Sequence, residues 1–192
     1  MPSSPTPRTQ TIREQNLDRT KQAILQAAQA LFATRGYAEA GVRDIAGLAG
    51  VNPALIARYY GSKLELFEVA LDSLLDVTPF TTVDRAVFGE RLAAAFFETR
   101  PDAASVIPML VFAAGDSQAR QSALRLLGER VVRPLEAWFG EAQADERSAQ
   151  LIAVITGFYT YRLMLPLKPL TGEPSATMRQ WLARTLQEIV DR

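Results

Sequence analysis

The 192-residue sequence predicts an all-α protein, with a small three-helix head at the N-terminus fused to a larger helical C-terminal body. Apolar residues recur every three or four positions through most of the chain, which is the period of an amphipathic helix. No strand-like alternation of any length appears, and Pro and Gly residues separate the periodic segments. No internal repeat is evident.

The N-terminal segment, residues 1–17, is polar and rich in Pro, which predicts a disordered arm. A helix is expected over residues 19–37, with Gly36 as the residue that ends it. The apolar face of this helix consists of Ile24, Ala27, Ala28, Leu31 and Phe32.

Residues 42–59, VRDIAGLAGVNPALIARY, satisfy the steric pattern of two short helices joined by a tight turn. Ala46 falls where the helices come closest, and Gly50 falls at the corner, which needs a left-handed conformation. Asn52 is a good N-cap for the second helix, and Pro53 suits its first position. The pattern predicts a helix-turn-helix whose second helix enters a DNA major groove.

Ser62 is the expected N-cap of a following helix over residues 62–77. The body then continues as helices at about 84–99, 101–114, 117–139, 146–165 and 174–191, with Pro134 kinking or interrupting the long one. The 146–165 helix is strongly apolar but too short for a membrane span, and it carries Arg162. No membrane association is therefore expected.

The segments ILQAAQALFATRGY and VRDIAGLAGVNPALIARYYGSKLELF together resemble the DNA-binding region of the TetR family of bacterial transcriptional regulators. The resemblance covers roughly residues 19–70. It implies a helix-turn-helix domain over 18–63 and a ligand-binding and dimerisation domain over 64–192. It also implies that Lys63 contacts a phosphate, and that of Tyr59 and Tyr60 one touches phosphate while the other packs inward.

Three positions depart from the family pattern: Gly41 lacks the usual capping hydroxyl, Ala57 replaces an aromatic residue or His, and Leu55 can read only a thymine methyl or pack on sugar. Arg43 and Arg58 then become the main candidates for base or phosphate contact. Arg58 could instead be a solvated residue, and Arg43 could pair with Asp44. The full expected DNA-binding set is Arg43, Asn52, Pro53, Ala54, Leu55, Arg58, Tyr59, Tyr60 and Lys63.

Charge is distributed unevenly along the chain. Residues 1–63 carry 8 Lys or Arg and 4 Asp or Glu, whereas residues 64–192 carry 13 and 17, although the total is balanced. A positive head on a negative body fits contact of one end with phosphate. The chain has no Cys and no His, so the commonest metal ligands and the commonest general base are missing. We expect no metal, no cofactor, no enzymatic activity and a cytoplasmic location.

The bulky residues of the middle helices are either core or contacts to a small ligand. The expected ligand-binding set is Phe96, Met109, Phe112, Phe158, Tyr159 and Arg162. Pro108 either leaves room for a pocket or is harmless in a first helical turn. Arg162 needs a partner in its apolar surroundings, either Glu98, Asp102 or a ligand carboxylate.

The last two long helices have broad apolar faces, and the resemblance places a dimer interface on them. The expected interface set is Leu151, Ile155, Tyr159, Trp181, Leu182, Leu186 and Ile189. The sequence thus predicts a ligand-responsive repressor that binds a palindromic operator on double-stranded DNA as a homodimer and is released by a small apolar effector. The alternative is a DNA-binding regulator without such a ligand, either an activator or one controlled by a partner protein.

Overall fold

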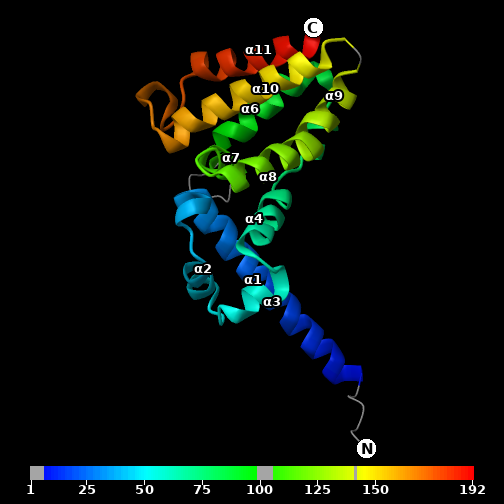
Figure 1. Cartoon of the computed structure of the whole chain (residues 1–192). Helices are drawn as coiled ribbons and strands as arrows, with labels where there is room; N and C mark the ends of the chain where they lie inside the picture. The colour runs from blue at the N-terminus through cyan, green and yellow to red at the C-terminus, as the bar shows by residue number, and fades with distance from the viewer. Residues whose placement is uncertain (1–6, 99–105, 141) are drawn as a thin grey trace, which may run out of the picture.

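A computed structural model describes residues 7–98, 106–140 and 142–192, with side chains from residue 15 onward, and in this part of the chain every regular element is helical. Figure 1 shows the first three helices forming the head, and α4 leading from them to a body built from the remaining helices. The expected all-α fold is confirmed. No helix among the described residues is long and apolar enough to cross a membrane.

The head consists of α1 (Pro7–Glu39), α2 (Val42–Ala49) and α3 (Ala54–Tyr60). Helix α1 begins at Pro7, so the expected disordered arm is wrong for residues 7–17, whereas residues 1–6 lie outside the described residues. Proline suits the first helical position, and extending a packed helix costs far less than nucleating one. The expected end of this helix is confirmed, since Gly36 leaves the helical conformation with φ 73°.

Helix α4 (Lys63–Asp72) starts with the expected cap, because Ser62 Oγ accepts a hydrogen bond from the Glu65 N–H at 3.1 Å. The helix ends at Asp72 and does not reach residue 77 as expected. The Ser73 hydroxyl donates to the Ala70 carbonyl at 2.9 Å and accepts from Gln29 Nε2 at 2.9 Å. Residues 74–77, here called the strap, then run without helical structure to the short α5 (Thr78–Thr81).

The body helices follow the expected order. They are η1 (Arg85–Val87), α6 (Phe88–Glu98), α7 (Val106–Ala113), α8 (Ser117–Leu127), η2 (Gly128–Val132), α9 (Arg133–Phe139), α10 (Ala144–Tyr159), η3 (Thr160–Met164), η4 (Lys168–Leu170) and α11 (Ala176–Asp191). The part of the expected 101–114 helix before residue 106 lies outside the described residues. Pro108 occupies the first turn of α7, where its missing N–H costs nothing.

The expected irregularity near Pro134 takes the form of a π-helical turn. Segment η2 is π-helical, and Pro134 follows as the second residue of α9. Pro134 has no N–H to donate within the helix, and the single wider turn before it accommodates the missing hydrogen bond. The helical path therefore continues from Ser117 to Phe139. A second π-helical turn, η3, ends the helical path that starts with α10.

Two apolar clusters form the core. The first cluster, here called the head cluster, joins buried residues of α1–α4 to residues of α7 and α8, and includes the fully buried Phe32, Ile45 and Phe67. The second, here called the body cluster, joins α6, α9, α10 and α11 around residues such as Phe88 and Leu186. The head cluster therefore extends beyond the three head helices into the body.

Helices α6 and α11 approach closely at Gly89. Its N–H donates to Gln187 Oε1 at 2.9 Å. A methyl group on Gly89 would overlap the Ala183 carbonyl oxygen and lie 2.9 Å from the backbone nitrogen of Gln187. The backbone of α11 therefore limits this position to glycine.

We expect Gly89→Ala to lower the free energy of unfolding by ~1–3 kcal/mol, because the two backbones must separate and the body cluster must repack. Gly47→Ala is the matched control, since Gly47 is helical, exposed and has no neighbour within 4 Å of an added methyl group. That change should raise the free energy of unfolding by ~0.5–1 kcal/mol. Urea denaturation measures both, and a Gly89→Ala protein as stable as the control would contradict the close approach.

Candidate nucleic-acid interface and body cavity

The turn between α2 and α3 has the geometry that the sequence predicts. Gly50 adopts the left-handed conformation with φ 67° and ψ 33°. Its N–H donates to the Gly47 carbonyl at 3.2 Å, and the Val51 N–H donates to the Ala46 carbonyl at 3.0 Å. These two bonds form a Schellman motif, which satisfies the last carbonyls of α2 and turns the chain sharply.

The angle between α2 and α3 is held by a small buried contact. Ile45, Ala46 and Ile56 are each no more than 1% exposed, so the two helices meet through one methyl group and two isoleucines. Helix α3 starts where expected, because Asn52 Oδ1 accepts from the Ala54 N–H at 2.9 Å. The predicted capping role of Asn52 is confirmed.

One face of α3 is left open to solvent. Its exposed residues are Asn52, Pro53, Ala54, Ala57 and Arg58, and Leu55 beside them is half-buried. Arg43 on α2 is exposed as well, and within the described residues it forms no ion pair with Asp44. The Asp44 carboxylate instead accepts from the Gly41 N–H at 3.2 Å, and so caps the helix start that Gly41 cannot cap with a side chain.

Tyr59 and Tyr60 face different surroundings. The Tyr60 hydroxyl donates to the Lys21 carbonyl at 2.7 Å and ties α3 to α1, and burial raises the pKa of this phenol. The half-buried Tyr59 ring lies 5.9 Å from Lys21 Nζ and 5.9 Å from the Arg58 guanidinium carbon. This cationic and aromatic group borders the exposed face of α3.

Lys63 lies at the first turn of α4 and points back toward α1. Its Nζ is 4.4 Å from the centroid of the Tyr37 ring and 3.5 Å from the Ala38 carbonyl oxygen. Partial burial lowers the pKa of this amine, and the Asp116 carboxylate opposes that shift. The ammonium group is thus held at the junction of α1 and α4, where it faces the protein as well as solvent.

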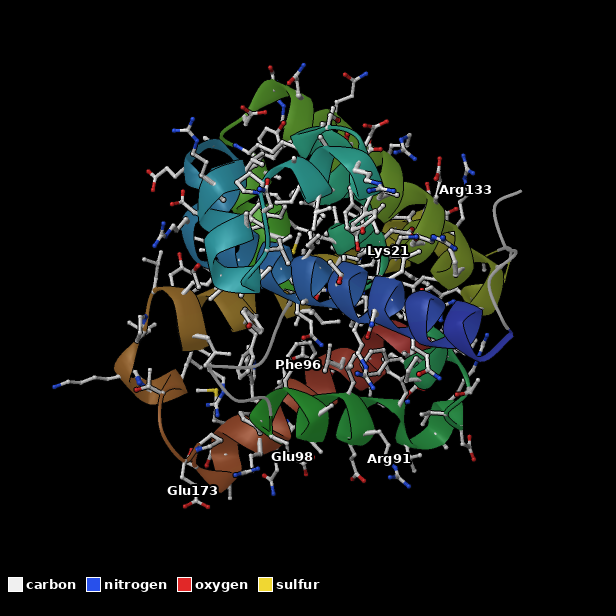
Figure 2. The ribbon with its side chains drawn as sticks, turned by 90° about the horizontal axis from the view of Figure 1, so that it is seen from below. Lys21, Arg91, Phe96, Glu98, Arg133 and Glu173 are labelled. Atoms are coloured by element: carbon white, nitrogen blue, oxygen red, sulfur yellow. The ribbon has the colours of Figure 1, made fainter. Side chains whose placement is uncertain are left out.

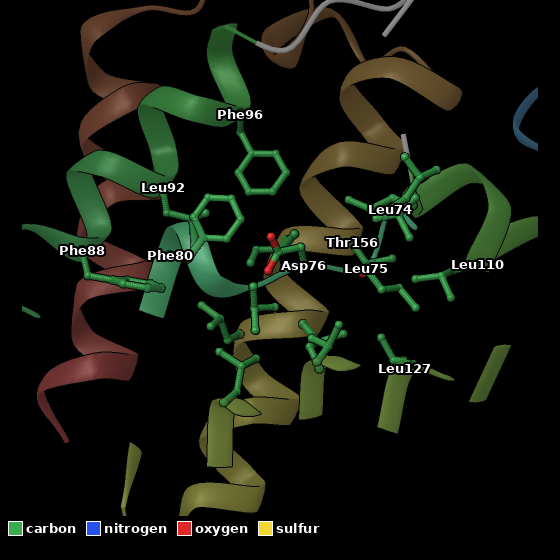
Figure 3. A pocket seen from close by; sticks show the side chains of 18 residues that line it. Leu74, Leu75, Asp76, Phe80, Phe88, Leu92, Phe96, Leu110, Leu127 and Thr156 are labelled. Carbon is green, nitrogen blue, oxygen red and sulfur yellow. The ribbon is translucent and has the colours of Figure 1, made fainter. Parts of the chain in front are cut away.

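The body contains a cavity of about 230 Å³ at the seam between the head and body clusters (Figure 3). Its walls come from the strap, α5, α6, α7, the α8–η2–α9 helical path and α10. The lining is almost entirely apolar and consists of Leu74, Leu75, Asp76, Val77, Phe80, Phe88, Leu92, Phe96, Val106, Ile107, Leu110, Leu127, Val131, Leu135, Leu151, Ile152, Ile155 and Thr156.

Of the residues expected to bind a ligand, the cavity contains Phe96 alone. Figure 2 shows Phe96 turned inward, whereas Arg91 and Glu98 of the same helix point away from the molecule. Met109, Phe158 and Tyr159 are buried in packed core and do not line the cavity, and Phe112 is 40% exposed and packs over Gly36. Side-chain size alone could not separate core from cavity wall.

Arg162 also lies outside the cavity lining, and its expected carboxylate partner is wrong within the described residues. Its guanidinium donates to the carbonyls of Leu170, Gly172 and Phe97 at 2.6, 3.3 and 3.3 Å. Desolvation, followed by the nearby Arg179, lowers the pKa of Arg162. Asp102 lies outside the described residues. Arg162 thus holds the segment after η3 against α6 through backbone oxygens.

The expected dimer interface needs correction as well. Leu182, Leu186 and Ile189 are at most 5% exposed and pack in the body cluster, largely against α6 of the same chain. Tyr159 is buried, and Leu151 and Ile155 line the cavity. Trp181 alone of the seven is an exposed side chain, at 48%. The apolar stripe of α11 is therefore mostly satisfied within one chain.

Sequence reasoning missed most of the cavity, especially the strap and Asp76. The sequence predicts a helix through the strap, because LFEVALDSLL continues a helical period to residue 75. A signal for its end was present in Asp76 followed by Thr78, since the Asp76 carboxylate accepts from the Thr78 N–H at 2.8 Å and starts α5.

Comparisons with known proteins agree with this geometry. Residues 24–70 match the family described as bacterial regulatory proteins, tetR family, and residues 86–190 match the tetracyclin repressor-like C-terminal domain. The chain belongs to the TetR family. TetR-family regulators bind DNA and dimerise.

A transcriptional repressor of Mycobacterium tuberculosis is 50% identical over 52 residues, which are 27% of this chain and 28% of that protein. The match to this curated relative therefore spans little more than a quarter of its length. A TetR-family regulator from Streptomyces coelicolor is similar in structure, with a TM-score of 0.54, 26% identity, and coverage of 91% of this chain and 96% of that one. A regulator from a Rhodococcus species has a TM-score of 0.68 at 17% identity, covering 91% and 97%, and shows the fold alone.

We expect Lys63→Ala to weaken binding to all DNA sequences alike, if the ammonium group neutralises a phosphate. Each phosphate contact contributes ~0.9 to the slope of log affinity against log salt, so a dimer should lose roughly 2 units of slope. Lys168→Ala, a change in η4 of the body, is the control and should leave the slope unchanged. An unaltered slope for Lys63→Ala would assign Lys63 to the α1–α4 junction only.

Proposed function

We propose that the protein is a ligand-responsive transcriptional repressor that binds a palindromic operator as a homodimer and is released when a small, largely apolar molecule fills the body cavity. The observation that carries this proposal is the position of the cavity between the head and body clusters. The head cluster holds the helix-turn-helix, and the body cluster holds α10 and α11. A molecule at the seam can therefore change how one cluster sits on the other.

Helix α4 supplies the mechanical link in this proposal. Near its middle, Phe67 packs edge-on against Phe32 and Tyr37 with ring centroids 5.3 Å apart in both pairs. At its end, Asp72 forms two hydrogen bonds with Arg130 of η2, at 2.5 and 2.8 Å. The strap that follows α4 is part of the cavity wall.

A second polar contact joins the middle of α4 to α8. Glu68 Oε1 accepts from the Ser122 hydroxyl at 2.6 Å and from Arg125 Nη2 at 3.0 Å. Leu127 and Val131, on the same helical path as Arg125 and Arg130, line the cavity. A ligand that moves this path therefore acts on α4 through two ion pairs as well as through the strap.

The proposed release follows from the geometry of DNA. Two recognition helices must lie ~34–36 Å apart to enter successive major grooves, so a displacement of a few ångströms loses one half-site. With few polar side chains on the exposed face of α3, one head alone has little to hold a half-site. A dimer is the economical arrangement, and a protein that acts on the bacterial chromosome would work in the cytoplasm.

The dimer interface that we propose uses the faces of α10 and α11 that this chain leaves uncovered. On α11 the exposed residues Thr177, Trp181, Arg184 and Glu188 follow one another at helical spacing. On α10 the small residues Ala149 and Ala153 are exposed in the same way. Small side chains allow a close approach, and Trp181 supplies a large apolar anchor.

A regulator that activates transcription is the second candidate. A relative named as a transcriptional activator, FasR of Mycolicibacterium smegmatis, is 37% identical over 59 residues, which are 31% of this chain and 27% of that protein. Selection of bound DNA from a random pool, followed by transcription from the selected site with and without the protein, separates the two. Repression supports our proposal, and stimulation supports activation.

We expect Arg58→Ala to cost ~1–3 kcal/mol per half-site, because Arg58 is the longest donor on the exposed face of α3. The variant should also relax the preference at one base pair, a G·C pair, because arginine pairs with the edge of guanine. Arg91→Ala is the control, since Arg91 is exposed on α6 of the body and points outward (Figure 2). Operator selection with each variant measures the preference. An unchanged selected sequence for Arg58→Ala would make Arg58 a backbone contact.

We expect Trp181→Glu to raise the dimer dissociation constant at least ~100-fold. Burying a large apolar side chain contributes ~1.5–3 kcal/mol, and two-fold symmetry counts it twice. Leu124→Glu is the matched control, because Leu124 is 64% exposed on α8. Sedimentation measures the assembly, and a gel shift measures operator binding. A Trp181→Glu protein that stays dimeric at the concentration where the control is dimeric would contradict this interface.

A further inference from the structure

One charged side chain lies at the rim of the body cavity, because Asp76 lines the cavity and is also exposed to solvent. Asp76 is the only ionisable side chain among the described residues that line it, and Thr156 is the only other polar one. None of the described Lys or Arg side chains forms an ion pair with Asp76. The carboxylate at the rim of an apolar cavity attracts a ligand that carries a positive charge at one end and places its apolar part inside the cavity.

The Asp76 carboxylate is also held in place and kept ionised. It accepts from the Thr78 N–H at 2.8 Å at the start of α5. Hydrogen bonds from Thr78 hold the pKa of the Asp76 carboxyl below its usual value. The negative charge is therefore present at neutral pH, at a fixed point on the strap.

The aromatic residues of the cavity suit the same kind of ligand. Phe80, Phe88 and Phe96 line it, and the face of an aromatic ring attracts a cation within about 6 Å. Figure 3 shows the Asp76 carboxylate among the apolar side chains, with the Phe80 and Phe96 rings on the same side of the cavity. A carboxylate together with aromatic rings is the usual protein environment of an organic ammonium group.

We propose that the effector is a small organic cation, whose ammonium group pairs with Asp76 and whose apolar part lies against the phenylalanines and the aliphatic wall. This inference rests on the proposed ligand-responsive function and names the chemical class of the ligand. The volume of about 230 Å³ lies between ~150 Å³, a cavity that holds benzene, and ~300 Å³, the lower end for drug-sized sites. A cation with a single ring therefore fits.

An organic anion or a neutral molecule fits the cavity less well. An anion would face the Asp76 charge with no Lys or Arg in the described lining to balance it. A neutral apolar molecule would fill the apolar part of the cavity but would make no electrostatic contact with the Asp76 carboxylate at its rim. Because Asp76 lies on the strap, four residues after the end of α4, a paired cation acts directly on the segment that follows the linking helix.

The test uses a pair of isosteres that differ only in charge. Phenyltrimethylammonium and tert-butylbenzene have the same shape, with nitrogen replaced by carbon, and benzoate supplies the opposite charge. Titration calorimetry with the full-length protein should give an affinity for the cation at least about tenfold higher than for the neutral isostere. Benzoate should give no measurable binding.

Asp76→Asn removes the charge and keeps the oxygen that accepts from Thr78, so α5 retains its cap. This variant should bind the cation at least about tenfold more weakly and should bind tert-butylbenzene within about twofold of the unaltered protein. Asp145→Asn, in the exposed first turn of α10, is the matched control and should change neither affinity. Unchanged melting temperatures show that both variants remain folded.

Equal affinities for the two isosteres, an Asp76→Asn protein that keeps the preference for the cation, or the absence of binding by any probe would each overturn the assignment of a cation. Operator binding without ligand is measured separately by gel shift, so the proposed DNA-binding function is judged on its own. If the cation binds through Asp76 but the operator complex is unaffected, the cation site stands and the proposed ligand response fails.

Discussion

Helix α4 is attached on two sides, and the remaining structure depends on this attachment. Leu66, Phe67, Ala70 and Leu71 are fully buried in the head cluster, which also contains residues of α7 and α8. Fully burying one large apolar side chain contributes ~1.5–3 kcal/mol, so α4 cannot separate from the head without a large loss of stability. The ion pairs of Glu68 and Asp72 are partly exposed, so they contribute little to stability. Their main effect is to fix the orientation of α4 against α8 and η2.

The same constraint explains why the cavity lies where it does. The head cluster and the body cluster have separate buried residues, and the cavity lies where the two clusters meet. The π-helical turn η2 lies at this boundary, and its Val131 lines the cavity while the adjacent Arg130 binds α4. An apolar cavity costs stability for as long as it is empty, so an occupant of suitable shape and charge stabilises the arrangement that holds it.

The head presents a sparse surface for reading DNA. Its local geometry is firmly built, with a Schellman turn at Gly50, an Asn52 cap and the Tyr60 tether to α1. Its exposed polar groups are few, since Ala54 and Ala57 occupy positions on the open face of α3. In the proposed function this sparseness makes the spacing of two heads decisive, and a cavity that changes the spacing can then control binding.

Features that depend on neighbours within about four residues could be predicted from the sequence. Gly50, Asn52 and Ser62 could be assigned roles in advance, because left-handed turns and helix caps are local steric and hydrogen-bond requirements. The succession of body helices followed from their periodicity, and the exposed side of α3, which we propose faces DNA, followed from the motif. Even the strap left a local trace, in Asp76 followed by Thr78.

The surface that each apolar face meets could not be predicted in this way, because it depends on packing between distant parts of the chain. The apolar stripe formed by Leu182, Leu186 and Ile189 could pack equally well against a second chain or against α6. In the structure it packs against α6, which the close approach at Gly89 allows. The cavity could not be derived either, because its walls come from six stretches of chain and depend on how the two clusters fit. Periodicity shows that a side chain will be covered, but the partner that covers it is set by packing between residues far apart in the sequence.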